Sequence, residues 1–394
     1  MLIDVGAKSF PQSLWGTTTE SLRESAPGLD EFATPLVTLR REAIDHNTEL
    51  LANWATSAGV SLCPHGKTSM APALWQKMLD AGAWGITLAT VWQAQVAATN
   101  GVPRIMIANE VTDGTSLDWA TSQRQVDLFV WIDSFRGLRL IEQRRPTSPL
   151  SVLIDVGGGG GRTGTRTDAE FRALAQAVAN SPSVRLCGIA GYEGALAHSR
   201  SAEDLATVRS YCERLAELYQ MAEDLFEVSS PLISASGSVY YDVIAEELRR
   251  ISPDAQIILR PGSFQIHDGG HYERLSPFGR DSEGPRLKTA LEGWATVLSR
   301  PEPDLILLDG GRRDFGFDID LPQIDAEDAR LNGPAETFEI NDQHLFVRVT
   351  PSCNLAVGDR VRLMLSHPCT SLDKWRLIPL VEDDRVIDAI ETWF

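Results

Sequence analysis

The feature that most constrains the fold is a repeated alternation between residues 34 and 265. Short runs rich in β-branched and apolar residues alternate there with longer stretches of helical periodicity. Nine runs predict strands, among them PLVTL (35–39), SVLIDV (151–156) and QIILR (256–260), and stretches such as EAIDHNTELLANWA (42–55) predict the helices between them. This pattern is typical of βα units around a parallel sheet, although nine strands are one too many for an eight-stranded barrel.

From about residue 266 the chain changes character. Gly, Pro and Asp become frequent, and strand-like runs such as HLFVRVT and DRVRLMLSH are separated by turns rather than by helices. The acidic interval 314–342 predicts a solvated loop region. A chain of 394 residues has room for two domains. The sequence therefore predicts an α/β barrel at 34–265 followed by a mainly β domain.

The net charge limits the partners of the chain. Its 36 Lys and Arg residues against 54 Asp and Glu residues give a formal charge of −18. A surface this acidic repels phosphate backbones and anionic lipid headgroups unless its basic residues cluster. We therefore expect no nucleic acid and no membrane as partner, and an anionic substrate would need local cations in its site.

The cysteines and the N-terminal residues indicate in which cellular compartment the protein is expected. The five cysteines are widely spread and form no CxxC pair, so neither a disulfide framework nor a structural zinc module is indicated. The segment MLIDVGAKSFPQSLW lacks a basic start followed by an apolar stretch, and no apolar run approaches the length of a membrane span. We expect a cytoplasmic protein.

A lysine follows the second predicted strand, in CPHGKTSM (63–70). A phosphate-binding loop ending in GKT would need a glycine at position 61, where the chain has Ser61, so the nucleotide interpretation fails. Barrel enzymes place active-site groups at the carboxyl ends of their strands, where Lys67 could form a Schiff base. The simpler alternative is a solvated loop lysine.

A glycine-rich segment follows the strand at 151–156 and satisfies G-x-G-x-x-G within GGGGGRTG (157–164). A dinucleotide site is one interpretation, with Glu193 as the ribose ligand. The strand is not the first of the series, however, and Arg162 and Arg166 fall where that motif runs into a helix. The alternatives are a loop that directs one or two guanidinium groups toward a phenolate or carboxylate, and a glycine-rich turn with surface arginines.

Two more loops of small residues follow predicted strands, SASGSV (234–239) and RPGSF (260–264). Their backbone N–H groups can approach a phosphate closely, and a helix beginning near Val239 would add its dipole. Each loop alone is an ordinary turn. Beside a lysine and an arginine loop at a barrel mouth, they suggest a phosphorylated cofactor.

The motif LMLSHPCTSLDKW (363–375) lies in the second domain. His367 and Cys369 are two residues apart, so in extended backbone their side chains leave the same face and could share a zinc ion. Two unrelated polar residues at a strand end are the more common case. His344 could support such a metal site, although a structural histidine is the simpler interpretation, and the same holds for His65.

Taken in order, these motifs resemble the fold-type III pyridoxal-phosphate enzymes. The similarity is to the branch with D-serine dehydratase, D-threonine aldolase and D-threo-3-hydroxyaspartate dehydratase. The residues that carry it are TPLVTLRREAIDHN (34–47), the lysine segment with the unit that follows (64–94), GGGRTGTR, GYEG (191–194), SASGS, LRPGSF and HPCT. The resemblance implies a (β/α)8 TIM-like barrel of alanine racemase type at 34–265 plus a mainly β domain from 1–33 and 266–394. The entry strand crosses over to the β domain in this family, which accounts for the ninth strand.

The same resemblance implies roles for individual residues. Lys67 matches the lysine that binds pyridoxal 5'-phosphate covalently, and Arg162 and Tyr192 match residues that line the cofactor. Arg260 stands where racemases place an arginine near the pyridine nitrogen. The residues that match phosphate-binding loops are Ser236, Gly237, Ser238, Gly262 and Ser263.

The resemblance also bears on the metal and the reaction. His367 and Cys369 match the zinc-binding pair of the dehydratases, whereas the aldolases usually carry Asp at the second position. Another divalent metal could replace zinc. Phe264 stands where many relatives have Tyr, so a hydroxyl for proton transfer is absent at that position.

We therefore expect a pyridoxal-phosphate- and zinc-dependent lyase that acts on a D-3-hydroxyamino acid. Lys67 would remove the Cα proton, the metal would assist the departure of the β-hydroxyl, and the products would be a 2-keto acid and ammonia. D-Serine, D-threonine and 3-hydroxyaspartate all fit as substrates. The alternatives are a metal-dependent D-threonine aldolase, a non-catalytic protein that stores pyridoxal phosphate, and a dehydrogenase built on the glycine run. The resemblance also implies a homodimer, while the roles of His65, His344 and Asp373 stay open.

Overall fold

The computed structural model describes all 394 residues and contains two sheets. The first is an eight-stranded parallel sheet in the order β2-β9-β8-β7-β6-β5-β4-β3. Its ends meet, because Trp84 N donates to Leu62 O over 2.7 Å and Thr87 N donates to Pro64 O over 2.8 Å. The sheet is therefore closed into a barrel. Its strands are β2 (Ser61–Leu62), β3 (Ile86–Leu88), β4 (Arg104–Glu110), β5 (Asp127–Ile132), β6 (Leu150–Val156), β7 (Val184–Gly191), β8 (Leu232–Ala235) and β9 (Gln256–Leu259).

Helices alternate with the barrel strands, as the periodicity predicts. They are α2 (Arg41–Ser57), α3 (Pro72–Asp80), α4 (Val91–Thr99), α5 (Gly114–Ser122), α6 (Phe135–Glu142), α7 (Asp168–Ala179), α8 (Ala202–Met221) and α9 (Tyr241–Ile251). Local sequence sets several of their starts: in α7, Thr167 accepts from the Glu170 amide while the Glu170 carboxylate accepts from the Thr167 amide. Every residue of β6 is buried, because helices cover one face of the sheet and the barrel interior covers the other.

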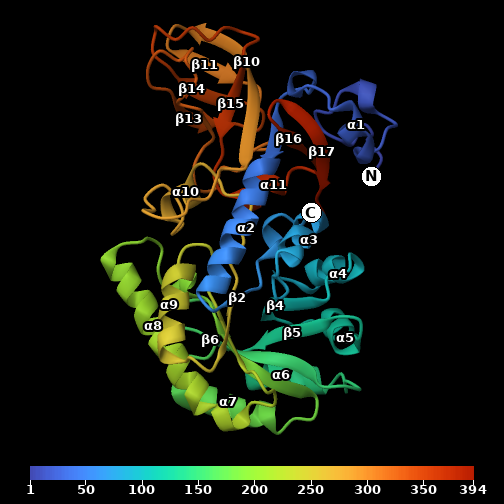
Figure 1. Cartoon of the computed structure of the whole chain (residues 1–394), viewed down its shortest axis with the longest axis vertical. Coiled ribbons are helices and arrows are strands. Elements are labelled where there is room, and N and C mark those ends of the chain that lie inside the picture. The colour runs from blue at the N-terminus through green and yellow to red at the C-terminus, as the bar shows by residue number, and fades with distance from the viewer.

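The second sheet has nine strands and lies above the barrel in Figure 1. Its main order is β13-β14-β11-β10-β1-β16-β17, and β15 pairs with both β10 and β12. The strands are β1 (Leu36–Arg40), β10 (Leu291–Glu302), β11 (Leu305–Leu308), β12 (Gln323–Ile324), β13 (Glu336–Ile340), β14 (Leu345–Arg348), β15 (Arg360–Met364), β16 (Leu377–Glu382) and β17 (Arg385–Glu391). Short helices α1 (Leu22–Ser25), α10 (His271–Leu275) and α11 (Pro368–Leu372) complete this part.

Strand β1 connects the two sheets. It pairs antiparallel with β10 and parallel with β16, and the next element along the chain is α2, which leads into β2. Figure 1 shows α2 running from the upper sheet down to the barrel. The one predicted strand too many for the barrel, PLVTL (35–39), thus belongs to the second sheet as β1, as the resemblance implied. The eight-stranded barrel with a mainly β second part is confirmed.

The expectation of a solvated loop over residues 314–342 is wrong in part. The segment contains β12 and β13, and its first residues, Asp314 and Phe315, are 1% and 0% exposed. Asp314 is buried because it has partners, since its carboxylate pairs with Lys8 and accepts the Gly311 amide. The acidic composition of the whole segment hid this local pairing.

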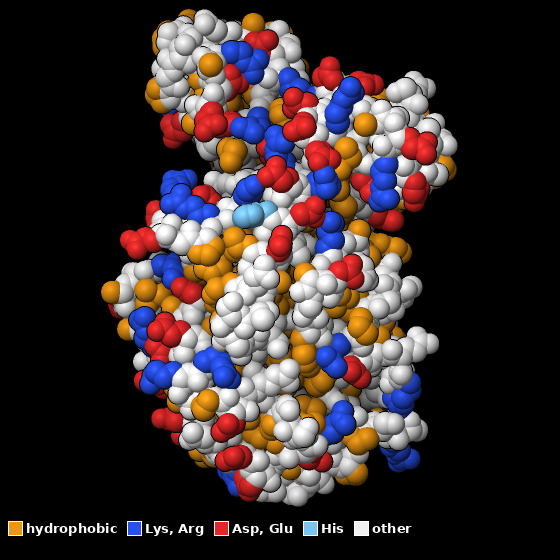
Figure 2. Space-filling view, in the orientation of Figure 1, with side chains coloured by type: hydrophobic (Ala, Val, Ile, Leu, Met, Phe, Trp, Pro, Cys, Tyr) orange, Lys and Arg blue, Asp and Glu red, His pale blue; other side chains and the backbone are white.

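The surface charge is dispersed on the face shown in Figure 2. Acidic and basic side chains are interspersed there rather than gathered into a patch of one sign. None of the helices is at once long enough and apolar enough to cross a bilayer.

Gly188 provides a test of the barrel packing. It lies in β7 with φ +150°, and an added Cβ would come within 2.1 Å of the Leu232 backbone oxygen in β8. We expect Gly188→Ala to lower the free energy of unfolding by more than about 2 kcal/mol, because backbone atoms of the barrel would have to move. Urea unfolding measures this loss. Gly284→Ala is the control, since a Cβ there meets nothing closer than 3.9 Å, and an equal effect of both changes would contradict the packing.

Candidate active site

A cavity of about 280 Å³ lies where the barrel mouth meets the second sheet. It brings together predicted residues that are up to 302 positions apart, from Lys67 to Cys369. Two of the predicted residues, Ser236 and Ser263, are buried directly beside the lining rather than in it. The full lining is His65, Lys67, Thr68, Ala89, Ala108, Asn109, Trp131, Arg162, Tyr192, Gly237, Ser238, Arg260, Gly262, Tyr272, His367 and Cys369.

Lys67 reaches the cavity because the chain turns sharply after β2. Residues Gly66–Thr68 form a 3₁₀ turn, and Trp75 Nε1 donates to the Gly66 carbonyl over 3.0 Å. A Cβ at Gly66 would lie 2.7 Å from both the Trp75 indole and Ile86, so the turn can pack this closely only with glycine. This packing fixes the base of the lysine segment.

Arg162 and Arg166 have different environments. The Arg162 guanidinium lies 4.9 Å from the centre of the Tyr192 ring, and both residues line the cavity. Arg166 turns back onto its own loop and donates to the Thr163 and Gly164 carbonyls, each over 2.7 Å. Only one of the two guanidinium groups therefore faces the cavity.

The glycine loop does not open a helix. Helix α7 begins only at Asp168, after the loop has been held by Arg166. The second requirement of a dinucleotide site also fails, because Glu193 is 1% exposed and both of its carboxylate oxygens accept backbone amides. The dehydrogenase alternative has no geometric support.

Three buried nitrogen atoms around the cavity lack hydrogen-bond partners within the protein: His65 Nδ1, Trp131 Nε1 and Arg260 Nε. The other Arg260 nitrogens donate to Ser234 Oγ and to the Gly191 carbonyl, each over 2.6 Å, and the guanidinium lies 4.8 Å from the centre of the Trp131 ring. Buried polar groups are nearly always paired in folded proteins. A flat ligand with acceptor atoms at its rim, such as the pyridine nitrogen and phenolate oxygen of pyridoxal phosphate, could pair with such groups, so these residues fit pyridoxal phosphate.

The two loops of small residues are joined to each other. Ser238 Oγ accepts the amides of Gly262 and Ser263 over 3.1 and 3.2 Å. A Cβ at Gly262 would lie 2.7 Å from the Cβ of His65, so the glycine allows this loop to approach the lysine segment closely. The amides of Gly262 and Ser263, which are predicted to bind a phosphate, are thus already paired with Ser238, and the two loops form one connected cradle.

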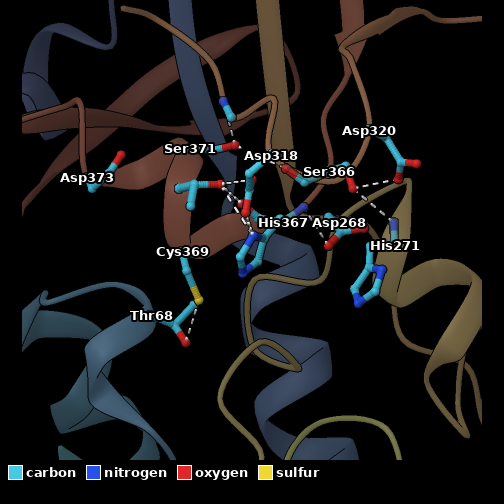
Figure 3. Close-up of polar contacts among 12 residues, drawn as sticks. Thr68, Asp268, His271, Asp318, Asp320, Ser366, His367, Cys369, Ser371 and Asp373 are labelled. Atoms are coloured by element: carbon cyan, nitrogen blue, oxygen red, sulfur yellow. Dashed lines mark hydrogen bonds and ion pairs between the residues drawn. The ribbon is translucent and has the colours of Figure 1, made fainter. Parts of the chain in front are cut away.

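His367 and Cys369 meet by a different geometry from the predicted one. They do not extend from a strand: His367 has left-handed backbone, with φ +53°, and immediately precedes α11, which contains Cys369. The His367 amide donates to Asp268 Oδ2 over 3.1 Å, and Asp268 is fully buried. Figure 3 shows both side chains and Asp268, with Cys369 pointing toward Thr68, whose Oγ1 lies 3.5 Å from Sγ.

Asp318 orients the His367 ring. Its Oδ2 lies 2.6 Å from His367 Nδ1, and its Oδ1 accepts the Thr370 hydroxyl over 2.6 Å (Figure 3). A carboxylate on Nδ1 leaves Nε2 for a metal, the arrangement that commonly supports a histidine ligand. No group of three or more His, Cys, Asp or Glu side chains is gathered to hold a metal. An ion on His367 and Cys369 would therefore need water or substrate as further ligands.

The electrostatics of this pair favour charge separation. Burial acts to lower the pKa of His367, but Cys369 and Asp318 outweigh it and raise the pKa to about 9. Burial acts to raise the pKa of the Cys369 thiol, yet hydrogen bonds from His367 and Thr68 lower it. The two side chains thus shift each other toward their charged forms, and thiolate and neutral imidazole are the forms that would bind a metal.

Other histidines and one aspartate have clearer surroundings in the structure. His65 lines the cavity, and burial lowers its pKa well below the ordinary value, so its ring is neutral. His344 lies in the turn between β13 and β14, outside the cavity lining. Asp373 pairs with its neighbour Lys374 over 2.8 Å.

No sequence motif marks several residues of the site, namely Thr68, Asn109, Trp131, Asp268, Tyr272 and Asp318. Asp318 belongs to the segment predicted to be a solvated loop. Their roles depend on which segments the fold brings together, and no local motif records that.

Two family models match the chain. The model described as "Alanine racemase, N-terminal domain" matches residues 39–242, which is more than half of the chain. The model described as "Putative serine dehydratase domain" matches residues 290–381. The first match covers barrel strands β2 to β8 and ends before β9, and the second lies over strands β10 to β16.

Curated relatives match most of the chain. D-threonine aldolase from Arthrobacter sp. is 28% identical over 366 residues, covering 91% of each protein. 3-Hydroxy-D-aspartate aldolase from Paracoccus denitrificans (strain Pd 1222) is 24% identical over 368 residues, covering 89% of each. These relatives are lyases.

Solved structures share the fold. D-threonine aldolase from Filomicrobium marinum aligns with a TM-score of 0.80 at 22% identity, over 92% of this chain and 95% of that one. D-threo-3-hydroxyaspartate dehydratase from Delftia sp. HT23 aligns with a TM-score of 0.72 at 18% identity, over 93% and 99%. The arrangement of barrel and second sheet is thus common to all three chains.

Asp318 offers a test of the metal pair. We expect Asp318→Asn to weaken zinc binding roughly 10- to 100-fold. The neutral amide of Asn lacks the negative charge with which the Asp318 carboxylate orients the His367 ring. Equilibrium dialysis of the purified protein against zinc measures the affinity. Asp328→Asn is the matched control, since that carboxylate pairs with Arg330 elsewhere in the second sheet region. Equal zinc affinity in the Asp318 variant and the wild type would contradict this role.

Proposed function

We propose that this chain, which belongs to the alanine racemase N-terminal domain family of fold-type III pyridoxal-phosphate enzymes, is a lyase of D-3-hydroxyamino acids. It eliminates water to give a 2-keto acid and ammonia, with pyridoxal phosphate bound at Lys67 and zinc bound at His367 and Cys369. Another divalent metal could serve in place of zinc.

One observation carries the proposal. One and the same cavity, of about 280 Å³, is lined by Lys67, by Arg162 and Arg260 with residues of the glycine and serine loops, and by the His367–Cys369 pair. An amine nucleophile, a phosphate cradle and a metal pair are the groups that such a reaction requires. A protein that only stored the cofactor would have no use for the metal pair.

Different residues of the chain have different roles in the proposed reaction. When bound, pyridoxal phosphate supplies an electron sink for charge that develops at Cα, and the metal supplies a Lewis acid for the β-oxygen. Lys67 Nζ accepts the Cα proton as general base. Arg162 lines the same cavity and offers a guanidinium to an anionic oxygen. Phe264 is 3% exposed and has no hydroxyl, so it cannot transfer a proton.

Cys369 supports dehydration over retro-aldol cleavage. The His-x-Cys sequence is the one that the resemblance associates with dehydratases. One solved structure of D-threo-3-hydroxyaspartate dehydratase is of a metal-free form, which supports a metal in that relative.

Retro-aldol cleavage is the second candidate. The relatives that are 28% and 24% identical over nine-tenths of the chain are aldolases, and both reactions can begin at the same cofactor and metal. The substrate itself depends on the walls around the β-substituent, and D-serine, D-threonine and 3-hydroxyaspartate remain in the proposal. The homodimer, the cytoplasmic location and the division into a barrel domain at 34–265 and a β domain from 1–33 and 266–394 remain predictions.

D-Threonine separates the two reactions. Incubation of the holoenzyme with D-threonine and zinc is expected to release 2-oxobutyrate and ammonia, measured by a coupled dehydrogenase assay and by ammonia detection. Glycine and acetaldehyde as the products would replace the dehydratase with the aldolase. No turnover across a panel of D-3-hydroxyamino acids, with or without zinc, would contradict both.

Lys67 and the metal can be removed separately. We expect Lys67→Ala to lower kcat at least about 10³-fold, because the general base and the covalent anchor are both lost. Lys77→Ala is the matched control, since that lysine pairs with Asp45 on the outer surface. Chelation is expected to abolish elimination in the wild type and zinc to restore it. Activity that survives in Lys67→Ala would contradict the role of the lysine.

A further inference from the structure

Glu193 is a buried carboxylate that the proposed reaction does not use. It follows β7 directly, is 1% exposed, and does not line the cavity. Its Oε2 accepts the amide of Ser236 over 3.0 Å, and its Oε1 accepts the amide of Gly237 over 2.9 Å. The two acceptors are thus matched to two donors in the loop that follows β8.

Burying this carboxylate has a cost that its partners offset. Burial raises the pKa of Glu193, while the Gly237 and Ser236 amides and the charge of Arg260 counteract that shift. A buried charge is retained only where it is paired and hydrogen-bonded. An ionised carboxylate, which offers only acceptors, satisfies both amides at once, whereas an uncharged amide side chain cannot.

The loop that Glu193 holds has an unfavourable backbone conformation. Ser236 has φ +81°, a region that residues other than glycine rarely adopt. The hydrogen bond from its amide to Glu193 holds this conformation, and Ser238 then meets the amides of Gly262 and Ser263. Glu193 therefore fixes one loop from behind, and that loop fixes the other.

The direction of these bonds decides which groups are free for a ligand. The amides of Ser236 and Gly237 point to Glu193, and those of Gly262 and Ser263 point to Ser238 Oγ. The Ser238 hydroxyl lines the cavity and accepts two bonds, so its own hydrogen is free to donate. A phosphate would be received by this preformed surface rather than by a loop that closes around it.

We propose that Glu193 is a positioning residue that holds the 236–238 loop in the shape that receives a phosphate. It thereby gives the site its preference for phosphorylated over unphosphorylated pyridoxal. The inference rests on the proposed function in one respect, that the cavity binds pyridoxal phosphate. The inference adds Glu193, which supports the 236–238 loop from outside the cavity lining and does not contact the ligand.

The test compares pyridoxal phosphate with pyridoxal, which lacks only the phosphate. Dissociation constants of both are measured on the cofactor-free full chain by the visible absorption of the bound form. The wild type is expected to bind pyridoxal phosphate at least about a hundredfold more tightly. Glu193→Gln places an N–H₂ group against one of the two backbone amides. We expect this variant to bind pyridoxal phosphate at least tenfold more weakly than the wild type does, and pyridoxal less than twofold more weakly.

Two further variants complete the design. Glu247→Gln removes another largely buried carboxylate, one that pairs with Arg209 and Arg250 and does not line the cavity, and is expected to leave both constants unchanged. Glu193→Asp shortens the side chain so that it cannot reach both amides. This variant replaces Glu193→Gln if that variant does not fold. Its affinity for pyridoxal phosphate is expected to lie between the affinities of the wild type and of Glu193→Gln.

The outcomes separate this inference from the proposed function. A wild type that binds neither form removes the proposed function. A wild type that prefers the phosphorylated form while Glu193→Gln and Glu193→Asp keep the same preference overturns the role of Glu193. A variant that loses affinity equally for both forms, with a lower Tm, assigns Glu193 to general stability and overturns the inference as well.

Discussion

The pairing of β1 with β10 and β16 is the constraint on which the site depends. Because β1 belongs to the second sheet and leads through α2 into β2, the start of the barrel is tied to that sheet. Further contacts join the two parts near the lysine segment. Cys369 Sγ lies 3.5 Å from Thr68 Oγ1, and the Trp393 amide donates to the Met70 carbonyl over 2.8 Å. Lys67 and the His367–Cys369 pair share one cavity as a result.

The charge inside this cavity is opposite to that of the whole chain. The protein carries a formal charge of −18, yet the lining contains Lys67, Arg162 and Arg260 and no Asp or Glu. Two carboxylates near the site lie outside the cavity lining: Glu193 accepts two backbone amides, and Asp318 contacts the His367 ring. This separation lets acidic groups shape the cavity without repelling an anionic ligand, because local charges dominate in a poorly solvated site.

Much of the fold was accessible from the sequence, since the strand and helix periodicities are local signals. The motifs at strand ends also indicated the cavity, because parallel strands bring their carboxyl ends to one rim. What could not be predicted depends on contacts between distant segments. Asp318 is 49 residues from His367, and the geometry of His367 itself comes from left-handed backbone rather than from the expected strand. The sequence suggests only a ribose-binding role for Glu193, because its actual partners are two backbone amides, which no residue type identifies.

The proposed chemistry depends above all on covalent binding of pyridoxal phosphate by Lys67 in this cavity. The chain has five lysines, Lys8, Lys67, Lys77, Lys288 and Lys374, and only Lys67 lines the cavity. The most direct measurement is borohydride reduction of the protein with pyridoxal phosphate at one equivalent, followed by peptide mass mapping. We expect one pyridoxyl group per chain, on the peptide that contains Lys67. An unlabelled Lys67, or label spread over the other four lysines, would contradict it.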